Sequence, residues 1–237
     1  MKTTTTPPSL PPRAIVLAAG RGERMRPLTD TTPKPLLPVF GRPLIEWHLL
    51  ALARDGVREV VVNTAWLEDC FPAVLGDGSR FGLSIRYSHE CRDHGGALET
   101  AGGIATVQDW LCADGRAAFW VVSGDIWAPD FRFDAALAED FIASGQDARL
   151  WVVPNPPYHP RGDFDHDGTR MTYANLALMS PRLCAGLPVG RRAALGSLLI
   201  NGVAEGRIGL ETGVGRWENV GTPAQLAALQ SEPHPGA

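Results

Sequence analysis

Short apolar runs rich in β-branched residues alternate along this chain with longer segments in which apolar positions recur at helical spacing. The apolar runs predict buried strands at residues 13–17, 59–62, 83–87, 118–122 and 149–153. The longer segments predict helices at residues 44–54, 66–75, 99–111 and 133–143. This alternation predicts an α/β fold in which helices cover a parallel, doubly wound sheet.

The pattern changes after residue 153. Residues 154–167 are rich in Pro, Gly, Asp and His, which predicts an irregular loop. Beyond them the sequence predicts strands at residues 171–179, 207–210 and 217–220, and helices at residues 191–205 and 223–229. Because no repeat or linker interrupts this order, we expect a single domain over residues 13–231.

Composition narrows the class of ligand. The chain has 237 residues, 44% of them hydrophobic, and a net charge of −4. This charge argues against nucleic acid as a partner, and no apolar run approaches the ~20 residues that cross a bilayer. The widely spaced cysteines are typical of reduced thiols in a cytoplasmic protein. Residues 1–12 are rich in Thr and Pro, which predicts a disordered tail and not a secretory signal.

The apolar run at residues 13–17 ends in a turn of small residues and arginines, and a lysine follows between two prolines. In an open α/β sheet, ligands bind beyond the carboxyl ends of the strands. Gly20 and Gly22 allow close backbone approach, so that the following N–H groups can surround an anion. Arg24 and Lys34 can then neutralise phosphate oxygens. The spacing matches neither the dinucleotide motif nor the Walker A motif, and an ordinary turn with solvated arginines is the alternative.

The residues LAAGRGERM at 17–25, followed by PKPLLPV at 33–39, closely resemble the signature of the sugar-1-phosphate nucleotidyltransferases. The resemblance implies a three-layer αβα fold with a Rossmann-like, mostly parallel but mixed sheet of the nucleotide-diphospho-sugar transferase type. It also implies a nucleotide half at about residues 13–130 and a sugar-phosphate half at about residues 131–231. By the same resemblance, the nucleotide is bound by the residues of the first loop, namely Ala18, Ala19, Gly20, Gly22, Glu23, Arg24 and Lys34.

A second glycine-containing segment, LETAGG at residues 98–103, enters a predicted helix, whose N-terminus offers unpaired N–H groups to a ligand. Tight packing of the helix on the sheet is the alternative. In the family the matching segment borders the nucleobase, and this version resembles that of the uridylyl- and heptose-type members. The resemblance implies nucleotide contacts from Glu99, Thr100, Gly102 and Gly103.

Asp125 ends the sequence SGD after a predicted buried strand, where a carboxylate can hold Mg²⁺ against phosphates. A turn or capping role is the alternative. By resemblance, Asp125 is the first metal aspartate of the family. The second usually lies in the motif WxDxGTP, but residues 217–223 read WENVGTP, which places Asn219 in the aspartate position. The resemblance therefore implies that Asn219 coordinates through its amide oxygen, that Mg²⁺ binds more weakly, or that activity is low, because the adjacent Glu218 would point to the opposite face of a strand.

The segments at residues 62–67, 155–164 and 172–175 resemble the N-acetylmuramate-1-phosphate uridylyltransferases of bacterial cell-wall recycling. That resemblance implies that Asp163 and Asn175 help to hold the sugar phosphate, and a turn residue is the alternative for Asp163. The order Asp163-x-Asp165-x-Asp167 begins like a calcium-binding loop. We do not expect calcium there, because the twelfth position is Ala174 and the segment lies between predicted strands.

Taken together, the resemblance implies transfer of a uridylyl group from UTP to N-acetylmuramate 1-phosphate, with release of pyrophosphate during peptidoglycan recycling. Arg24, Lys34 and Asp125 would be the catalytic residues, and Mg²⁺ the cofactor. One alternative is a hexose- or heptose-1-phosphate uridylyl- or guanylyltransferase, and another is a catalytically weak nucleotide-sugar binding module, which Asn219 motivates. The expected partners are small-molecule substrates, without nucleic acid or membrane, and the oligomeric state stays open.

Overall fold

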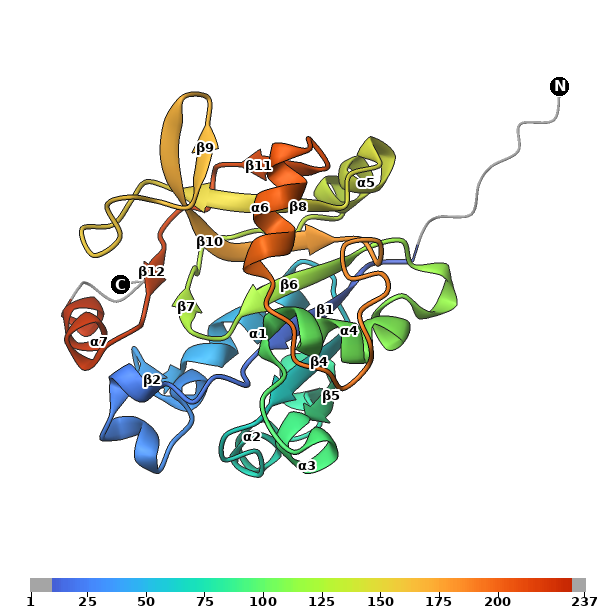
Figure 1. Cartoon of the computed structure of the whole chain (residues 1–237). Coiled ribbons are helices and arrows are strands. Elements are labelled where there is room, and N and C mark those ends of the chain that lie inside the picture. Colours follow the sequence, from blue (N-terminus) through green and yellow to red (C-terminus); the bar gives the residue numbers. More distant parts are fainter. Residues whose placement is uncertain (1–9, 232–237) are drawn as a thin grey trace, which may run out of the picture.

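A mixed sheet forms the centre of the molecule in the computed structural model, which describes residues 10–231 (Figure 1). Most of the predicted disordered tail, residues 1–9, therefore lies outside the described residues. The strand order is β11-β8-β10-β6-β1-β4-β5. These strands span β1 (Arg13–Leu17), β4 (Glu59–Thr64), β5 (Ser84–His89), β6 (Phe119–Ser123), β8 (Ala148–Val153), β10 (Thr169–Met179) and β11 (Ile208–Glu211). β10 runs antiparallel to β6 and β8, and the other pairs on this path are parallel, which confirms the mostly parallel, mixed sheet.

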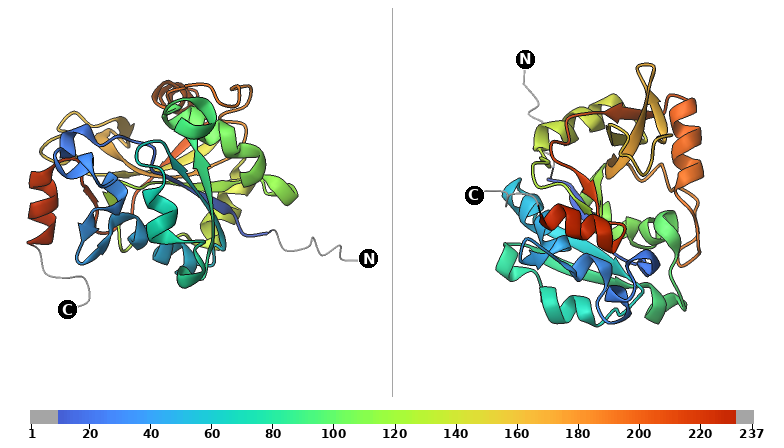
Figure 2. Two further views of the ribbon diagram at one scale, coloured as in Figure 1. Left: turned by 90° about the horizontal axis from the view of Figure 1, so that it is seen from below. Right: turned by 90° about the vertical axis from the view of Figure 1, so that its left-hand side faces the viewer.

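Helices cover both faces of the sheet, as the two views in Figure 2 show. Val16 of β1 packs in one apolar cluster with side chains of α1 (Leu44–Arg54), α2 (Cys70–Leu75) and α5 (Ala135–Ser144). Its neighbour Ile15 points to the other face and packs with α4 (Glu99–Leu111) and α6 (Gly196–Ala204). This alternation is the period-2 pattern of a strand that is buried on both faces. The three-layer αβα arrangement is thereby confirmed, and no helix within residues 10–231 is long and apolar enough to cross a membrane.

Two predicted helices begin later than expected, because tertiary contacts hold the preceding residues in other conformations. Trp66 donates its indole N–H to the carbonyl oxygen of Thr29 at 2.9 Å, and Leu67 has a φ of 49°, so α2 begins only at Cys70. Residues 191–195 are not helical either, since Ala193 exchanges backbone hydrogen bonds with Leu98 and Gly102. The prediction of helix is therefore wrong for residues 66–69 and 191–195.

The prediction of a loop over residues 154–167 is wrong at its end, where β9 (Phe164–His166) pairs with the start of β10. The two strands are joined by Asp167 and Gly168, with φ values of 51° and 77°. Positive φ at both central residues belongs to the tight hairpin turn that Asp-Gly favours. This dipeptide is the sequence signal for the hairpin: Asp167 ends the predicted loop and Gly168 follows it directly.

A third, smaller apolar cluster joins the C-terminal segment to residues from the N-terminal part of the chain. The short pairs β2 (Pro38–Val39) with β3 (Arg42–Pro43) and β7 (Ile126–Trp127) with β12 (Glu218–Asn219) lie here, beside α7 (Pro223–Gln230). Their apolar side chains form a third buried cluster, which includes Met25, Val39, Trp127, Val220 and Leu226. Because Met25 belongs to the first loop and Val220 follows β12, this cluster brings the two ends of the chain to one place.

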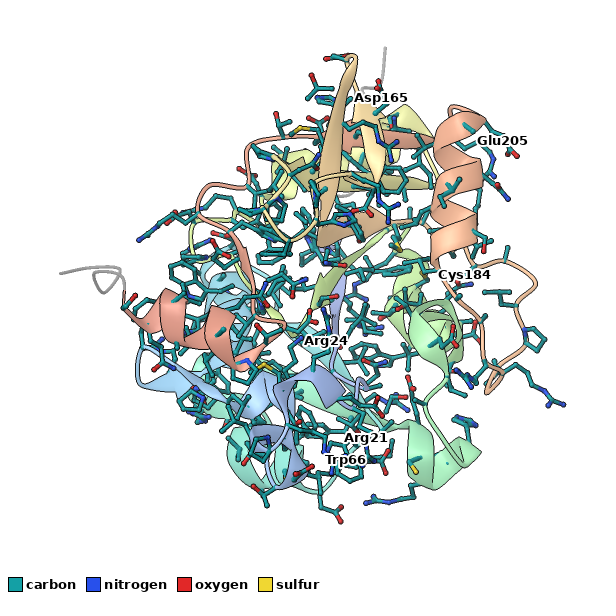
Figure 3. The ribbon with its side chains drawn as sticks, turned by 60° about the vertical axis from the view of Figure 1, so that its left-hand side comes forward. Arg21, Arg24, Trp66, Asp165, Cys184 and Glu205 are labelled. Carbon is teal, nitrogen blue, oxygen red and sulfur yellow. The ribbon has the colours of Figure 1, made fainter. Side chains whose placement is uncertain are left out.

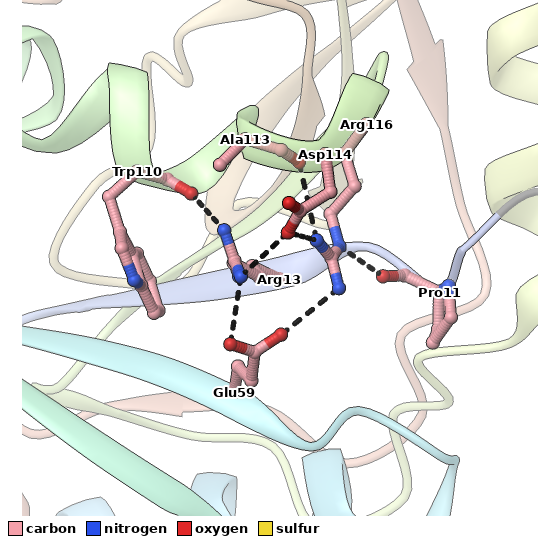
Figure 4. Close-up of polar contacts among 7 residues, drawn as sticks. All are labelled: Pro11, Arg13, Glu59, Trp110, Ala113, Asp114 and Arg116. Atoms are coloured by element: carbon pink, nitrogen blue, oxygen red, sulfur yellow. Dashed lines mark hydrogen bonds and ion pairs between the residues drawn. The ribbon is translucent and has the colours of Figure 1, made fainter.

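Ion pairs close the opposite end of the sheet, where β1 and β4 begin (Figure 4). The side chain of Arg13 is 8% exposed and contacts Glu59 at 2.8 Å and Asp114 at 3.2 Å. Arg116 contacts the same two carboxylates, at 3.0 Å and 2.9 Å respectively. Arg13 also donates to the carbonyl oxygen of Trp110. The network ties the start of β1 and β4 to the C-terminal end of α4, so these charges serve structure at the end remote from the strands' carboxyl termini.

His48 of α1 is a buried titratable group, with 1% of its surface exposed. Its Nε2–H donates to the carbonyl oxygen of Ile126 at 2.8 Å, which fixes the neutral tautomer. Burial lowers the pKa of His48 from 6.5 to about 4, although this hydrogen bond and the charge of Asp125 oppose the shift. His48 is therefore neutral in the folded protein at neutral pH, whereas the unfolded chain takes up a proton there below about pH 6.5.

We expect the free energy of unfolding to fall as the pH drops from about 6.5 towards 4, because protons bind more tightly to His48 in the unfolded chain than in the folded one. The contribution is fully present above about pH 6.5 and is on the order of 3 kcal/mol. His48→Gln keeps an N–H donor for Ile126 but cannot titrate. Chemical denaturation at a series of pH values should show a shallower slope for the variant, and equal slopes would contradict the assignment.

Candidate active site

A cleft opens where β1 and β6 end, at the carboxyl edge of the sheet. Its first cavity, of about 550 Å³, is lined by the first loop, the start of α4 and the residues after β6. A second cavity, of about 420 Å³, is lined by α6, β10, β12 and the segment before β9. A third, of about 400 Å³, shares Glu99 and Thr100 with the first cavity and Tyr173 and Asn175 with the second. The cavities are therefore parts of one cleft, with one half beside the first loop and the other half beside α6.

The predicted phosphate loop lines the first cavity from Ala18 to Arg24. Gly22 has a φ of 67°, and a Cβ atom there would lie 3.1 Å from side-chain atoms of Lys34 and Thr29. The hydroxyl of Thr29 donates to the carbonyl oxygen of Gly22 at 2.8 Å. Glycine is thus needed at position 22 for both its backbone angle and the close approach. A Cβ at Gly20 would meet open space, so its role in close approach to a ligand stays a prediction.

Lys34 and Asp125 meet on the floor of this cavity. The Nζ atom of Lys34 lies 2.8 Å from Oδ2 of Asp125, although the two residues are far apart in sequence. Lys34 is 6% exposed, in a 3₁₀ turn at Lys34–Leu36, and Asp125 follows the end of β6. Gly124 is held against β1 by its N–H, which donates to the carbonyl oxygen of Leu17 at 2.8 Å. The structure therefore brings a lysine and a carboxylate together where a phosphate would enter.

Two arginines of the first loop have different surroundings (Figure 3). The guanidinium of Arg21 stacks on the indole of Trp66, 3.9 Å from the ring centroid, which holds this side of the loop against the segment after β4. Arg24 lies higher in Figure 3 and borders both the first and the second cavity. Of the two, Arg24 is the cation that faces both halves of the cleft.

The predicted base segment divides into two parts. Glu99 and Thr100 line the first cavity, and Glu99 has the unusual φ of 60° and an ion pair with Arg192 at 2.5 Å. Gly102 and Gly103 face inward. A Cβ at Gly102 would lie 2.2 Å from the carbonyl oxygen of Arg191, and one at Gly103 would lie 2.5 Å from Glu90. The contacts of these two glycines are those of tight packing, and direct nucleotide contact stays a prediction for them.

Sequence reasoning missed a buried hydrogen-bond bridge beneath the cleft. Oδ1 of Asn63 accepts from the N–H of Ala18 at 2.9 Å, and Nδ2 of Asn63 donates to Oε1 of Glu90 at 2.7 Å. Oε2 of Glu90 accepts from the N–H of Leu98, also at 2.7 Å. The bridge thus runs from the first loop to the start of α4. Asn63 lies in the segment 62–67, and Glu90 precedes the segment 98–103. Nothing in the sequence indicates that these two residues form a hydrogen bond.

Burial raises the pKa of Glu90 above its ordinary value, while the hydrogen bonds from Leu98 and Asn63 favour the charged form. The residue is 0% exposed. Both oxygens of the carboxylate accept hydrogen bonds, so the group is satisfied in the ionised state. Its role is to hold two ligand-facing loops at a fixed separation.

The second cavity collects the predicted sugar-phosphate residues. Oδ1 of Asp163 lies 3.0 Å from Nε2 of His159, and Oδ2 accepts from the N–H of Tyr173 at 2.8 Å. Asn175 has a φ of 60° and lies at an irregularity in the pairing of β10 with β8. Such irregularities redirect side chains beside sites. Asp163 and Asn175 both line this cavity together with Asn219.

The two predicted metal ligands lie on paired segments. Asn219 of β12 is opposite Ile126 of β7, and the N–H of Val220 donates to the carbonyl oxygen of Asp125 at 3.0 Å. Oδ1 of Asn219 is buried and has no hydrogen-bond partner within residues 10–231. A buried carbonyl oxygen without a partner is the kind of oxygen that a hard cation takes as a ligand. Among the same residues, no group of three or more His, Cys, Asp or Glu side chains could hold a metal.

Comparison with known proteins shows the family to which the chain belongs. The profile of the nucleotidyl transferase family matches residues 13–164. The chain belongs to the nucleotidyl transferase family. The matched range contains the first loop, Lys34, the base segment and Asp125, so the resemblance drawn from residues 17–25 and 33–39 is confirmed. Asn175 and Asn219 lie beyond that range. The family is generally dependent on a divalent metal.

Relatives of this nucleotidyl transferase match it over different lengths. An N-acetylmuramate α-1-phosphate uridylyltransferase of Neisseria meningitidis serogroup B is 41% identical over 92% of this chain and 97% of its own. A mannose-1-phosphate guanylyltransferase of Mycobacterium tuberculosis is also 41% identical, but over 59% of this chain and 36% of its own. A solved structure of a putative glucose-1-phosphate thymidylyltransferase from Bacillus anthracis superposes with a TM-score of 0.75, at 20% identity, covering 92% of this chain and 94% of its own. That last likeness shows the fold.

We expect Glu90→Ala to weaken nucleotide binding although Glu90 itself lines no cavity, because Leu98 and the cavity-lining Asn63 lose their acceptor and the two loops are no longer held together. The loss in unfolding free energy should be about 3 kcal/mol, since buried donors are left unpaired. Titration calorimetry with nucleoside triphosphates and chemical denaturation measure the two effects. Glu139→Ala, an exposed position on α5, is the matched control. Unchanged nucleotide affinity in a folded Glu90→Ala protein would refute the role of the bridge.

Proposed function

We propose that this protein transfers a uridylyl group from UTP to N-acetylmuramate 1-phosphate, giving UDP-N-acetylmuramate and pyrophosphate in peptidoglycan recycling. The observation that carries the proposal is the match to a curated uridylyltransferase of that substrate, at 41% identity over 92% of this chain and 97% of the relative. The sequence matches to the guanylyltransferase and to two thymidylyltransferases cover only 36%, 55% and 39% of those relatives.

The geometry of the cleft supports an in-line transfer between two bound anions. A phosphate oxygen of the sugar is already anionic at neutral pH, so the attack on the α-phosphorus needs no strong general base. Catalysis then consists of positioning and charge neutralisation. Lys34 exchanges its partner Asp125 for phosphate oxygens as pyrophosphate leaves, and Arg24 faces the phosphates from between the two cavities. The first loop supplies backbone N–H groups to the same anion.

Mg²⁺ is the cofactor we propose, held by the carboxylate of Asp125 and the buried amide oxygen of Asn219. When bound, such an ion neutralises phosphate charge and orients the nucleotide oxygens. Asn219 supplies an oxygen without a negative charge, so this pair attracts a cation less strongly than two carboxylates would. The remaining steps, binding of both substrates and stabilisation of the leaving pyrophosphate, belong to the side chains of the cleft.

The substrates can be tested by measuring pyrophosphate release. The purified protein would be offered each of the four nucleoside triphosphates with N-acetylmuramate 1-phosphate, N-acetylglucosamine 1-phosphate, glucose 1-phosphate, mannose 1-phosphate or a heptose 1-phosphate. We expect the highest kcat/KM for UTP with N-acetylmuramate 1-phosphate. A higher value for GTP, or for a hexose or heptose 1-phosphate, would replace the proposal with the alternative uridylyl- or guanylyltransferase.

A catalytically weak binding module is the second candidate, and Asn219 is the observation that favours it. The matched position in the motif of the family is an aspartate, and its loss removes one charge from the metal site. Nucleotide binding without pyrophosphate release at saturating Mg²⁺ would support this candidate. The retained trio of Arg24, Lys34 and Asp125 supports the enzyme instead, because a binding module has no need of groups that stabilise a leaving pyrophosphate.

Location, partners and domain organisation are part of the same proposal. All four cysteines are free, and the thiol of Cys91 is exposed, which suits a reducing compartment such as the cytoplasm. We propose small-molecule substrates and no nucleic acid as partners, since the net charge is −4.

We also propose that residues 13–231 are one domain, because the sheet continues from β5 in the nucleotide half to β11 in the sugar-phosphate half.

Replacing Lys34 with Ala should lower kcat about 100-fold while the KM for UTP changes by less than a few-fold, because its charge is needed most as pyrophosphate leaves. Initial rates at saturating Mg²⁺ measure the change. Arg26→Ala is the matched control, since it removes a cation from the same loop that pairs with Asp30 outside the cavity. Turnover equal to that of the unmodified protein in Lys34→Ala would refute the assigned role.

Asn219→Asp should tighten Mg²⁺ binding about tenfold, because affinity for hard cations rises with ligand charge. Titration calorimetry of Mg²⁺ into the protein with a non-hydrolysable UTP analogue measures this directly, apart from turnover. Asn201→Asp, at an exposed position on α6, adds the same charge elsewhere and should leave the affinity unchanged. An equal increase in both variants, or none in Asn219→Asp, would remove Asn219 from the metal site.

A further inference from the structure

The second cavity contains a histidine–carboxylate pair that the transfer reaction does not use. Nε2 of His159 lies 3.0 Å from Oδ1 of Asp163, and both residues line the cavity. Elsewhere such a pair orients a general base. Here the attacking oxygen is already anionic, so catalysis gives the pair no task. Its presence at the far side of the cleft therefore calls for another explanation, which is recognition of the sugar.

The pair is held in a fixed place. Asp163 accepts from His159 with one oxygen and from the N–H of Tyr173 with the other, at 2.8 Å. Its own N–H donates to the carbonyl oxygen of Met171 at 2.7 Å, and that of His159 donates to Pro156 at 2.8 Å. Among residues 10–231, the His159 ring has no other hydrogen-bond partner, so Nδ1 is available to a ligand. An imidazolium whose Nε2–H is bound by a carboxylate can still donate from Nδ1.

Arg24 and His159 lie at different ends of the cleft. Arg24 borders the first and the second cavity, so it faces the phosphate group that joins the two substrates. His159 borders only the second of these two and stands at the sugar end. Leu199 and Ile200 of α6 line the same cavity, and Ile200 is 60% exposed, an apolar surface that suits methyl groups. The cavity thus offers a guanidinium for a phosphate, an imidazole ring for a second group of the sugar, and an apolar flank.

We infer that His159, held by Asp163, binds a carboxylate carried by the sugar and so determines specificity for an acidic sugar 1-phosphate. The inference rests on the proposed function, in which the lactyl ether of N-acetylmuramate carries such a carboxylate together with a methyl group. Neutral hexose 1-phosphates and N-acetylglucosamine 1-phosphate lack it. Asp163 then acts by holding the His159 ring in place.

The test compares two ligands that differ only in this charge. Titration calorimetry without UTP would measure the affinities for N-acetylmuramate 1-phosphate and for its lactamide, in which a neutral amide replaces the carboxylate. We expect the unmodified protein to prefer the acid about tenfold, as one charge-assisted hydrogen bond allows. In His159→Gln this ratio should fall to about one. His166→Gln on β9, which lines none of the three cavities, is the matched control and should keep the ratio.

Two further readouts separate recognition from folding and from the reaction itself. His159→Lys places an ammonium group at this position and should retain part of the preference, and thermal unfolding checks that each variant is folded. A ratio in His159→Gln equal to that of the unmodified protein would overturn the inference, as would no preference, or no binding of either ligand, in the unmodified protein. If the acid is preferred through His159 but no pyrophosphate is released with UTP, the proposed function fails while the inference stands.

Discussion

The two ligand-facing loops of this protein depend on one buried carboxylate. Glu90 is excluded from solvent and accepts hydrogen bonds from Asn63 and Leu98. A buried charge is unfavourable unless such bonds replace its hydration. Neither loop can therefore move away without leaving that charge poorly compensated. Since Asn63 also accepts from Ala18, the start of α4 and the end of β1 keep one separation, and that separation sets the width of the first cavity.

Charges are distributed differently at the two edges of the sheet. Where the strands begin, Arg13 and Arg116 share Glu59 and Asp114, so that each cation contacts both carboxylates. Where the strands end, Lys34 has Asp125 as its partner at a position open to the cleft, so an incoming anion can compete for it. The Lys34–Asp125 pair is as buried as the Arg13–Glu59 pair. The difference is that Lys34 and Asp125 border the first cavity, whereas the residues at the other edge do not.

Local pattern predicted most of the fold, because β1, α1 and α4 are continuous apolar or periodic segments whose bounds depend on their own residues. The family motifs also indicated Lys34 and Asp125, which meet in space. Contacts between residues that are far apart along the chain could not be predicted from the sequence. Residues 191–195 carry a helical pattern but bind the start of α4 through backbone atoms, and Glu90 reaches Asn63 only after three strands are aligned. These contacts depend on the assembled sheet, and no spacing along the chain encodes them.

The position of Arg24 on the boundary of both cavities has an energetic consequence for binding in the proposed reaction. Each substrate would bring negative charge to this boundary, so the charge of one bound substrate would change the affinity for the other. Thermodynamic reciprocity then requires that whatever factor the nucleotide imposes on the affinity for the sugar phosphate is imposed equally in return. The two halves of the cleft would then be thermodynamically linked, with Arg24 at their shared boundary.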